Sequence, residues 1–122
     1  MEIKYEIFEK WLDEILSNDM PEEVEAVNFN LYEQGNDSWS IELIAAASFD
    51  ENDEDWACDE VFDTRDMPFD ISYDGNWEEV LELFSGFVCD YLKKGSYAEK
   101  LKKFKAVAIG FVDGDINVLY QR

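Results

Sequence analysis

The chain has 122 residues and a formal net charge of −20, with 30 acidic side chains, 10 basic side chains and no histidine. Its hydrophobic fraction of 47% and aromatic fraction of 16% exclude an intrinsically disordered acidic chain, because such chains are poor in aromatic residues. A single domain over residues 1–122 is expected at this length. The charge disfavours nucleic acid and anionic membranes as ligands and favours basic proteins or metal cations.

An amphipathic helix followed by a β-hairpin is predicted for the first part of the chain. Apolar residues at spacings of three and four predict the helix over residues 2–17, and Pro21 prevents its continuation. Apolar and polar residues alternate over residues 27–32 and again over 39–49, which predicts two strands. The turn-forming residues 33–38 join these strands into the hairpin.

The second strand of this hairpin also carries Ile44 and Ala46 on its other face, so we expect part of that face to be covered. An acidic loop at residues 50–55 comes next. A third strand is predicted over residues 56–62, and residues 63–74 are expected to be irregular.

Two helices are predicted after the irregular segment. Asn76 is expected to be the N-cap of a helix that ends at Lys94, with Gly95 in the C′ position. Residues 96–99 have the pattern of a capping box, which predicts a short helix that runs to Lys103.

A second hairpin is predicted at the end of the sequence. Residues 106–112 are apolar on both faces, as in a central strand, and Asp113 and Gly114 form a tight-turn signal before alternating residues 115–120. The predicted fold class is therefore α+β, with a mainly antiparallel sheet of about five strands and two or three helices. The predicted order is α-β-β-β-α-(α)-β-β.

Neighbouring residues indicate which tryptophans, phenylalanines and cysteines belong to the core. Trp11, Trp77, Phe84 and Phe87 lie on apolar helix faces and are assigned to the core, whereas Trp39 and Trp56 are left open between core and surface. Cys58 and Cys89 are expected to be buried thiols rather than a disulfide.

Most catalytic and metal-binding patterns are missing from the sequence. Without histidine there is no Ser-His-Asp triad, Cys-His pair or His-containing zinc site. No phosphate-binding glycine loop and no EF-hand spacing are present. No signal peptide and no apolar run of transmembrane length are visible, so a cytoplasmic, non-enzymatic protein without metal or cofactor is expected.

The acidic segment, defined as residues 50–66, carries the candidate site. It concentrates carboxylates around Trp56, and its only base is Arg65. Aromatic anchors surrounded by charge are typical of protein interfaces. The candidate partner-binding residues are Asp50, Glu51, Asp53, Glu54, Asp55, Trp56, Asp59, Glu60, Asp63 and Asp66. An alternative interpretation is that the acidic residues serve solubility alone.

Three stretches resemble the small acidic immunity proteins of bacterial polymorphic and contact-dependent toxin systems: WACDEVF (56–62), GNWEEVL (75–81) and AVAIGFVDGD (106–115). The resemblance implies a cytoplasmic inhibitor that binds and occludes a basic, nuclease-type toxin domain. A second hypothesis is a DNA mimic that inhibits a DNA-binding protein. A third is a carboxylate- or metal-dependent enzyme that uses Asp63, Asp66, Asp70 and Asp74. The oligomeric state stays open.

Overall fold

The computed structural model describes residues 4–35, 37–112 and 114–122. The start of the predicted first helix, Asn36 of the first predicted turn and Asp113 of the second therefore lie outside the described residues. The elements in chain order are α1 (Tyr5–Leu16), β1 (Ala26–Gly35), β2 (Ser38–Ala46), the 3₁₀-helix η1 (Glu54–Cys58), β3 (Glu60–Asp63), β4 (Phe69–Ser72), α2 (Trp77–Lys94), α3 (Ala98–Lys102), β5 (Ala106–Phe111) and β6 (Asn117–Gln121).

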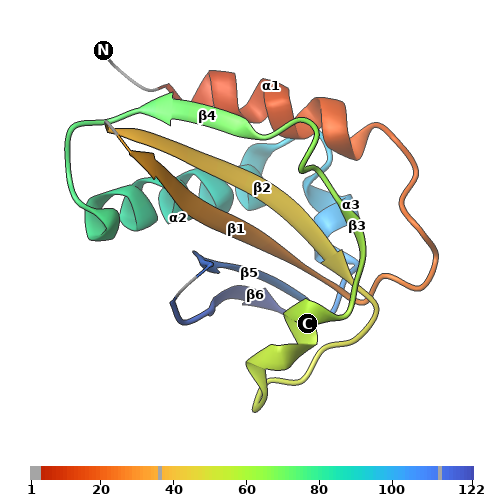
Figure 1. Ribbon diagram of the computed structural model, residues 1–122. Helices are drawn as coiled ribbons and strands as arrows, with labels where there is room; N and C mark the ends of the chain where they lie inside the picture. Colours follow the sequence, from red (N-terminus) through yellow and green to blue (C-terminus); the bar gives the residue numbers. More distant parts are fainter. Residues whose placement is uncertain (1–3, 36, 113) are drawn as a thin grey trace.

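The strands form one mixed sheet in the order β3-β2-β1-β5-β6, and β4 pairs with the same strand β2 as β3 does (Figure 1). The two predicted hairpins, β1–β2 and β5–β6, are both antiparallel. The central pair β1–β5 is parallel, with a register from Ala26 opposite Ala106 to Leu31 opposite Phe111. The α+β class and the mainly antiparallel sheet are thus confirmed, and within the described residues the sheet has six strands.

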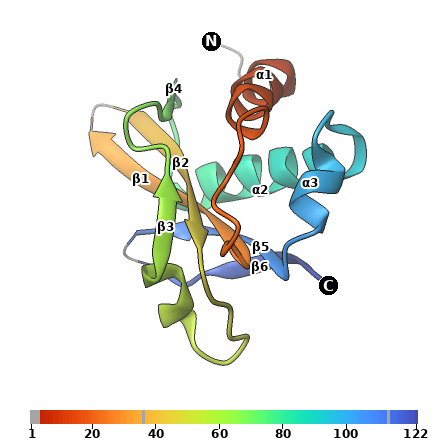
Figure 2. The same ribbon diagram turned by 90° about the vertical axis from the view of Figure 1, so that its right-hand side faces the viewer.

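The main core lies between one face of this sheet and the helices α1 and α2 (Figure 2). Phe8 of α1 is completely buried at its centre. Its ring centroid lies 6.3 Å from that of Phe29 on β1, 5.9 Å from Phe69 on β4 and 5.6 Å from Phe87 on α2. The core assignments of Trp11, Phe84 and Phe87 are confirmed.

Two segments before α2 differ from the prediction. Residues 56–58 belong to η1, and the strand begins only at Glu60. The side chain of Asp53 accepts a hydrogen bond from the backbone N–H of Asp55 and caps this helical turn. The segment predicted to be irregular contains β4, in which Phe69 and Ile71 are buried and alternate with exposed residues.

The helix α2 begins with the N-cap predicted from the sequence. It ends at the predicted glycine, but for a different physical reason. Asn76 and Glu79 form the reciprocal hydrogen bonds of a capping box. Gly95 has a φ of −69° and not the left-handed conformation expected of a C′ glycine. A Cβ at Gly95 would lie 2.6 Å from the ring of Tyr91, so close packing explains this glycine.

The short helix α3 begins at Ala98, after Tyr97 as its N-cap, and no side chain caps it. The capping box predicted at residues 96–99 is therefore wrong. Within the described ranges, no helix combines the length and apolar character that a membrane crossing requires.

Candidate partner-binding site

Trp56 attaches the acidic segment to the sheet. On the outer face, defined as the face opposite α1 and α2, small side chains such as Ala46 and Ala108 leave room for its indole ring. Trp56 is 5% exposed, and its ring packs edge-on against Phe49 at 5.3 Å. The question left open for Trp56 is answered in favour of the core. Its predicted role as a partner contact needs correction, because a buried ring is not accessible to a partner.

The same outer-face packing confirms that Ile44 and Ala46 are covered, since both are buried. The neighbouring thiol behaves differently. Cys58 is exposed, which contradicts the predicted buried thiol, because a 3₁₀ turn that directs Trp56 inward directs the residue two positions later away from the sheet. Cys89 is half-buried, and both cysteines are free.

Two other tryptophans mark the opposite end of the sheet. Trp39 is 3% exposed and donates its indole N–H to the carbonyl of Tyr73 at 3.0 Å. Trp77 was assigned to the core but is 55% exposed. As the first residue of α2 it lies beyond the buried stripe, and its ring packs edge-on against Phe111 at 6.0 Å. With Tyr32 and other neighbours it lines a hollow of about 430 Å³.

Four carboxylates of the acidic segment make hydrogen bonds that hold the segment in place. Asp50 and Asp53 accept from backbone N–H groups two residues further on, which closes local turns. Glu54 Oε2 accepts from the backbone N–H of Ile116 at 2.7 Å, and Glu51 Oε2 accepts from the side-chain amide of Gln121 at 3.0 Å. The segment is thus bound to the β5–β6 hairpin, although the two are distant in sequence.

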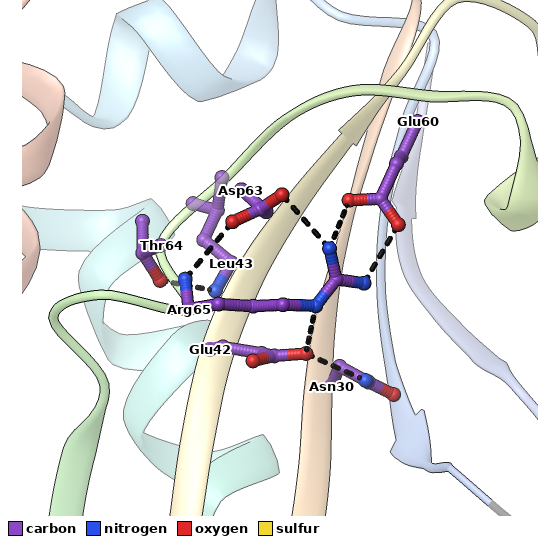
Figure 3. A network of polar contacts seen from close by, with 7 residues as sticks. All are labelled: Asn30, Glu42, Leu43, Glu60, Asp63, Thr64 and Arg65. Carbon is purple, nitrogen blue, oxygen red and sulfur yellow. Dashed lines mark hydrogen bonds and ion pairs between the residues drawn. The ribbon is translucent and has the colours of Figure 1, made fainter.

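Arg65 neutralises two further carboxylates of the predicted set (Figure 3). Its guanidinium donates to both oxygens of Glu60, at 2.6 and 2.7 Å, and to Asp63 Oδ2 at 2.8 Å. The backbone N–H of Arg65 also donates to Asp63 Oδ1. This bond, together with the guanidinium charge, lowers the pKa of Asp63. The hydrogen bond to Glu60 raises the pKa of Arg65.

Three predicted residues are left as freely exposed charges. The side chains of Asp55, Asp59 and Asp66 are exposed, and within the described part of the chain they take part in no hydrogen bond or ion pair. Figure 2 shows η1 and its loop projecting beyond the sheet and away from the helices. Asp55 and Asp59 therefore lie at a protruding but anchored turn. Asp66 lies beyond β3, next to Met67, whose carbonyl accepts a hydrogen bond from Trp11 of α1.

A polar cavity lies beside the acidic segment on the outer face. Its volume is about 360 Å³, and it is bounded by β1, η1 and the residues Val112, Gly114 and Ile116. Asn28 and Asn30 of β1 line it, and Glu42 of β2 is the cross-strand neighbour of Asn30. Asn30 Nδ2 donates to Glu42 Oε1 at 3.0 Å, and the Arg65 Nε atom lies 3.7 Å from the same oxygen. Glu42 is only 5% exposed.

Asn28 stands out among the cavity residues. It is 4% exposed, and its Oδ1 atom has no hydrogen-bond partner within the described residues. Buried polar groups are normally paired, so an unpaired acceptor needs an explanation. Asn28, Asn30 and Glu42 were not predicted from the sequence as site residues. The available signal was a polar residue at every second strand position, which is the ordinary pattern of a solvent-exposed face.

The four aspartates of the enzymatic hypothesis do not meet at one point of the structure. Asp63 binds Arg65, whereas Asp70 accepts a hydrogen bond from Ser40. Asp66 and Asp74 are exposed. Across residues 4–35, 37–112 and 114–122, no three His, Cys, Asp or Glu side chains are arranged to hold a metal ion.

Comparisons with protein-family models, with curated proteins and with solved structures find no match to this chain. The resemblance to immunity proteins therefore stays a hypothesis that rests on the three sequence stretches named above.

Proposed function

We propose that this chain is a non-catalytic, cytoplasmic inhibitor that binds a basic toxin domain, of the nuclease type, in the manner of an immunity protein. The observation that carries the proposal is the anchored acidic segment. Asp55, Asp59 and Asp66 are exposed and unpaired within the described residues, while buried Trp56 and the bonds of Glu51 and Glu54 hold the segment to the sheet.

Pre-organisation of this segment favours binding, because a partner does not have to order a flexible loop when it docks. A net charge of −20 attracts a basic partner over distances of about a Debye length, roughly 8 Å at physiological salt. Such steering raises association rates by about 10- to 1,000-fold at low ionic strength. The carboxylates then occupy the surface on which a nuclease would bind its anionic substrate.

The gathering of exposed carboxylates on one segment also favours an inhibitor over a DNA mimic. A mimic of duplex DNA needs carboxylates spaced along an extended face, as phosphates are along the helix axis. In this chain the free carboxylates of the predicted set lie between residues 55 and 66, and Asp55 among them lines the outer-face cavity.

The experiment uses the protein encoded by the neighbouring gene as the candidate partner. Its C-terminal domain is purified, its nuclease activity is titrated with this chain, and association is followed by stopped flow at several salt concentrations. The test variant carries Asp55→Lys, Asp59→Lys and Asp66→Lys. A control variant of identical charge change carries Glu14→Lys, Glu82→Lys and Asp90→Lys on the exposed surfaces of α1 and α2.

The wild-type chain is expected to inhibit the nuclease. The test variant should associate at least 10-fold more slowly at low salt and with a weaker salt dependence, because each rim charge contributes mainly to steering. The control variant should slow association by less than half as much, when the two changes in association rate constant are compared on a logarithmic scale. The proposal is wrong if the wild-type chain does not bind the domain. It is also wrong if the test and control variants reduce the association rate constant by the same factor.

A further inference from the structure

The floor of the outer-face cavity contains a hydrogen-bond acceptor that the protein leaves unused. Asn28 lies on the central strand β1, between Ile44 of β2 and Ala108 of β5. Its side chain is 4% exposed, and within the described residues its Oδ1 atom has no donor. Burying an amide oxygen without a hydrogen-bond partner destabilises the folded state. A ligand that donates a hydrogen bond at this place would remove that destabilisation.

The walls of the cavity are acidic. Glu54, Asp55 and Glu60 line it, and the lining side chain of opposite sign within the described residues is Arg65. The Nη donors of Arg65 are engaged by Glu60 and Asp63, and its Nε lies near the buried Glu42. An anionic ligand would have to displace these carboxylates from Arg65, whereas a cation meets a wall that carries three carboxylates and one guanidinium.

The size of the cavity matches a side chain rather than a single water molecule. Its volume is about 360 Å³, while a water molecule occupies about 30 Å³. Its roof has two parts, η1 and residues 114–116, which the bond from Ile116 N–H to Glu54 joins. Gly110 permits this arrangement, because a Cβ there would lie 2.5 Å from the carbonyl oxygen of Asp115.

From these observations we infer that the outer-face cavity binds a cationic N–H donor, the guanidinium or ammonium group of a basic side chain carried by the partner. The inference rests on the proposed function and deepens it, because it adds a buried contact to the electrostatic steering. Asn28 accepts a hydrogen bond from the inserted group, and the carboxylates of Glu54 and Asp55, which are not bound to Arg65, supply the complementary charge.

The cavity is tested first without any partner. Side-chain amide signals of Asn28 and Asn30 are followed by NMR while N-acetylarginine amide or N-acetyllysine amide is added. N-acetylcitrulline amide is the neutral isostere of the arginine probe. The expected result is a saturable shift of the Asn28 amide with the two cationic probes, with a Kd on the order of 1–10 mM. The citrulline probe should bind at least fivefold more weakly.

Two substitutions at the same position separate the cavity from the acidic surface. Asn28→Leu keeps the approximate shape but removes the acceptor, and should weaken binding of the arginine probe at least fivefold. Asn28→Asp adds a charge and should strengthen it. The matched control is Asn52→Leu, at an exposed asparagine in the same acidic loop. Because Asn52 lies outside the cavity lining, this change should leave the probe affinity within twofold.

The inference is overturned if the Asn28 amide does not shift at saturating cationic probe, or if Asn28→Leu binds the probe as tightly as the wild type. The second result would show adsorption to the acidic surface only. With the partner domain, Asn28→Leu should speed dissociation at least 10-fold. If the Asp55, Asp59 and Asp66 reversal slows association but Asn28→Leu changes nothing, the proposed function stands and the cavity inference fails. If the cationic probes bind to the cavity but the partner domain does not bind to the chain, the cavity is a cation site and the proposed function fails.

Discussion

Replacement of Trp56 by alanine tests the central structural claim, that this residue holds the acidic segment to the sheet. A tryptophan side chain buries about 150–250 Å², and Trp56 is only 5% exposed. At about 25 cal/mol/Å² this burial corresponds to roughly 4–6 kcal/mol, which is an upper estimate. Trp-to-Ala changes in cores cost about 3–5 kcal/mol. We expect a loss of about 3 kcal/mol, because η1 can detach and so avoid leaving a rigid void.

The assay is urea denaturation of the wild type, Trp56→Ala and the adjacent control Asp55→Ala. Asp55 is exposed, so its replacement should change the free energy of unfolding by less than about 0.5 kcal/mol. Amide hydrogen exchange gives the local readout. The N–H of Ala47 donates to the carbonyl of Asp59 at 2.9 Å, and it should lose protection in Trp56→Ala when the segment detaches.

The reasoning is refuted if Trp56→Ala loses less than about 1 kcal/mol, a value typical of partly exposed side chains and not of core tryptophans. Unchanged protection of the Ala47 amide would count against it as well. Partner association provides an independent check. A detached segment keeps its charges but loses its fixed position, so long-range steering should persist while dissociation becomes faster.

Three further predictions concern stability. Because its folded-state pKa is lowered, Asp63 stabilises the fold above its unfolded-state pKa of about 3.9 and loses this contribution as the pH falls below about 4. The urea midpoint of Asp63→Asn should therefore fall less steeply than that of the wild type between about pH 6 and 3. Tyr91→Phe removes the hydroxyl that donates to Asp13 at 2.5 Å and should cost about 1–2 kcal/mol in urea denaturation; a cost below about 0.3 kcal/mol would contradict that bond. Gly110→Ala should cost about 1–3 kcal/mol through its clash with the loop backbone, and a thermal midpoint equal to that of the wild type would disprove the close approach.

Elements with local signals were predicted well from the sequence. The start of α2 was readable because Asn76 and Glu79 cap each other within four residues. The strand β4 was missed because it has four residues and follows Pro68, so its alternation is too short to stand out. The prediction that Trp77 is a core residue was wrong because periodicity indicates which face of a helix is apolar. It does not indicate how far along the helix the sheet covers that face.

The candidate site was predicted only in part, for a comparable reason. The acidic segment is contiguous, so its charge density was visible in the sequence. The cavity depends on η1 and the β5–β6 hairpin meeting over β1, and this contact joins residues that are far apart in sequence. Asn28 and Asn30 alternate with apolar neighbours just as solvent-facing residues of an ordinary strand do. The burial of Asn28 follows from tertiary structure alone.

The parallel pairing of β1 with β5 has a consequence for synthesis on the ribosome. β1 is a central strand, but its second neighbour, Ala106–Phe111, is made long after the β1–β2 hairpin has emerged. Until then one edge of β1 exposes unpaired N–H and C=O groups, which are a template for association with other chains. Contacts between such distant segments also slow folding. A nascent chain that stalls before β5 should therefore aggregate or recruit a chaperone, whereas the emergence of β5 and β6 closes the sheet.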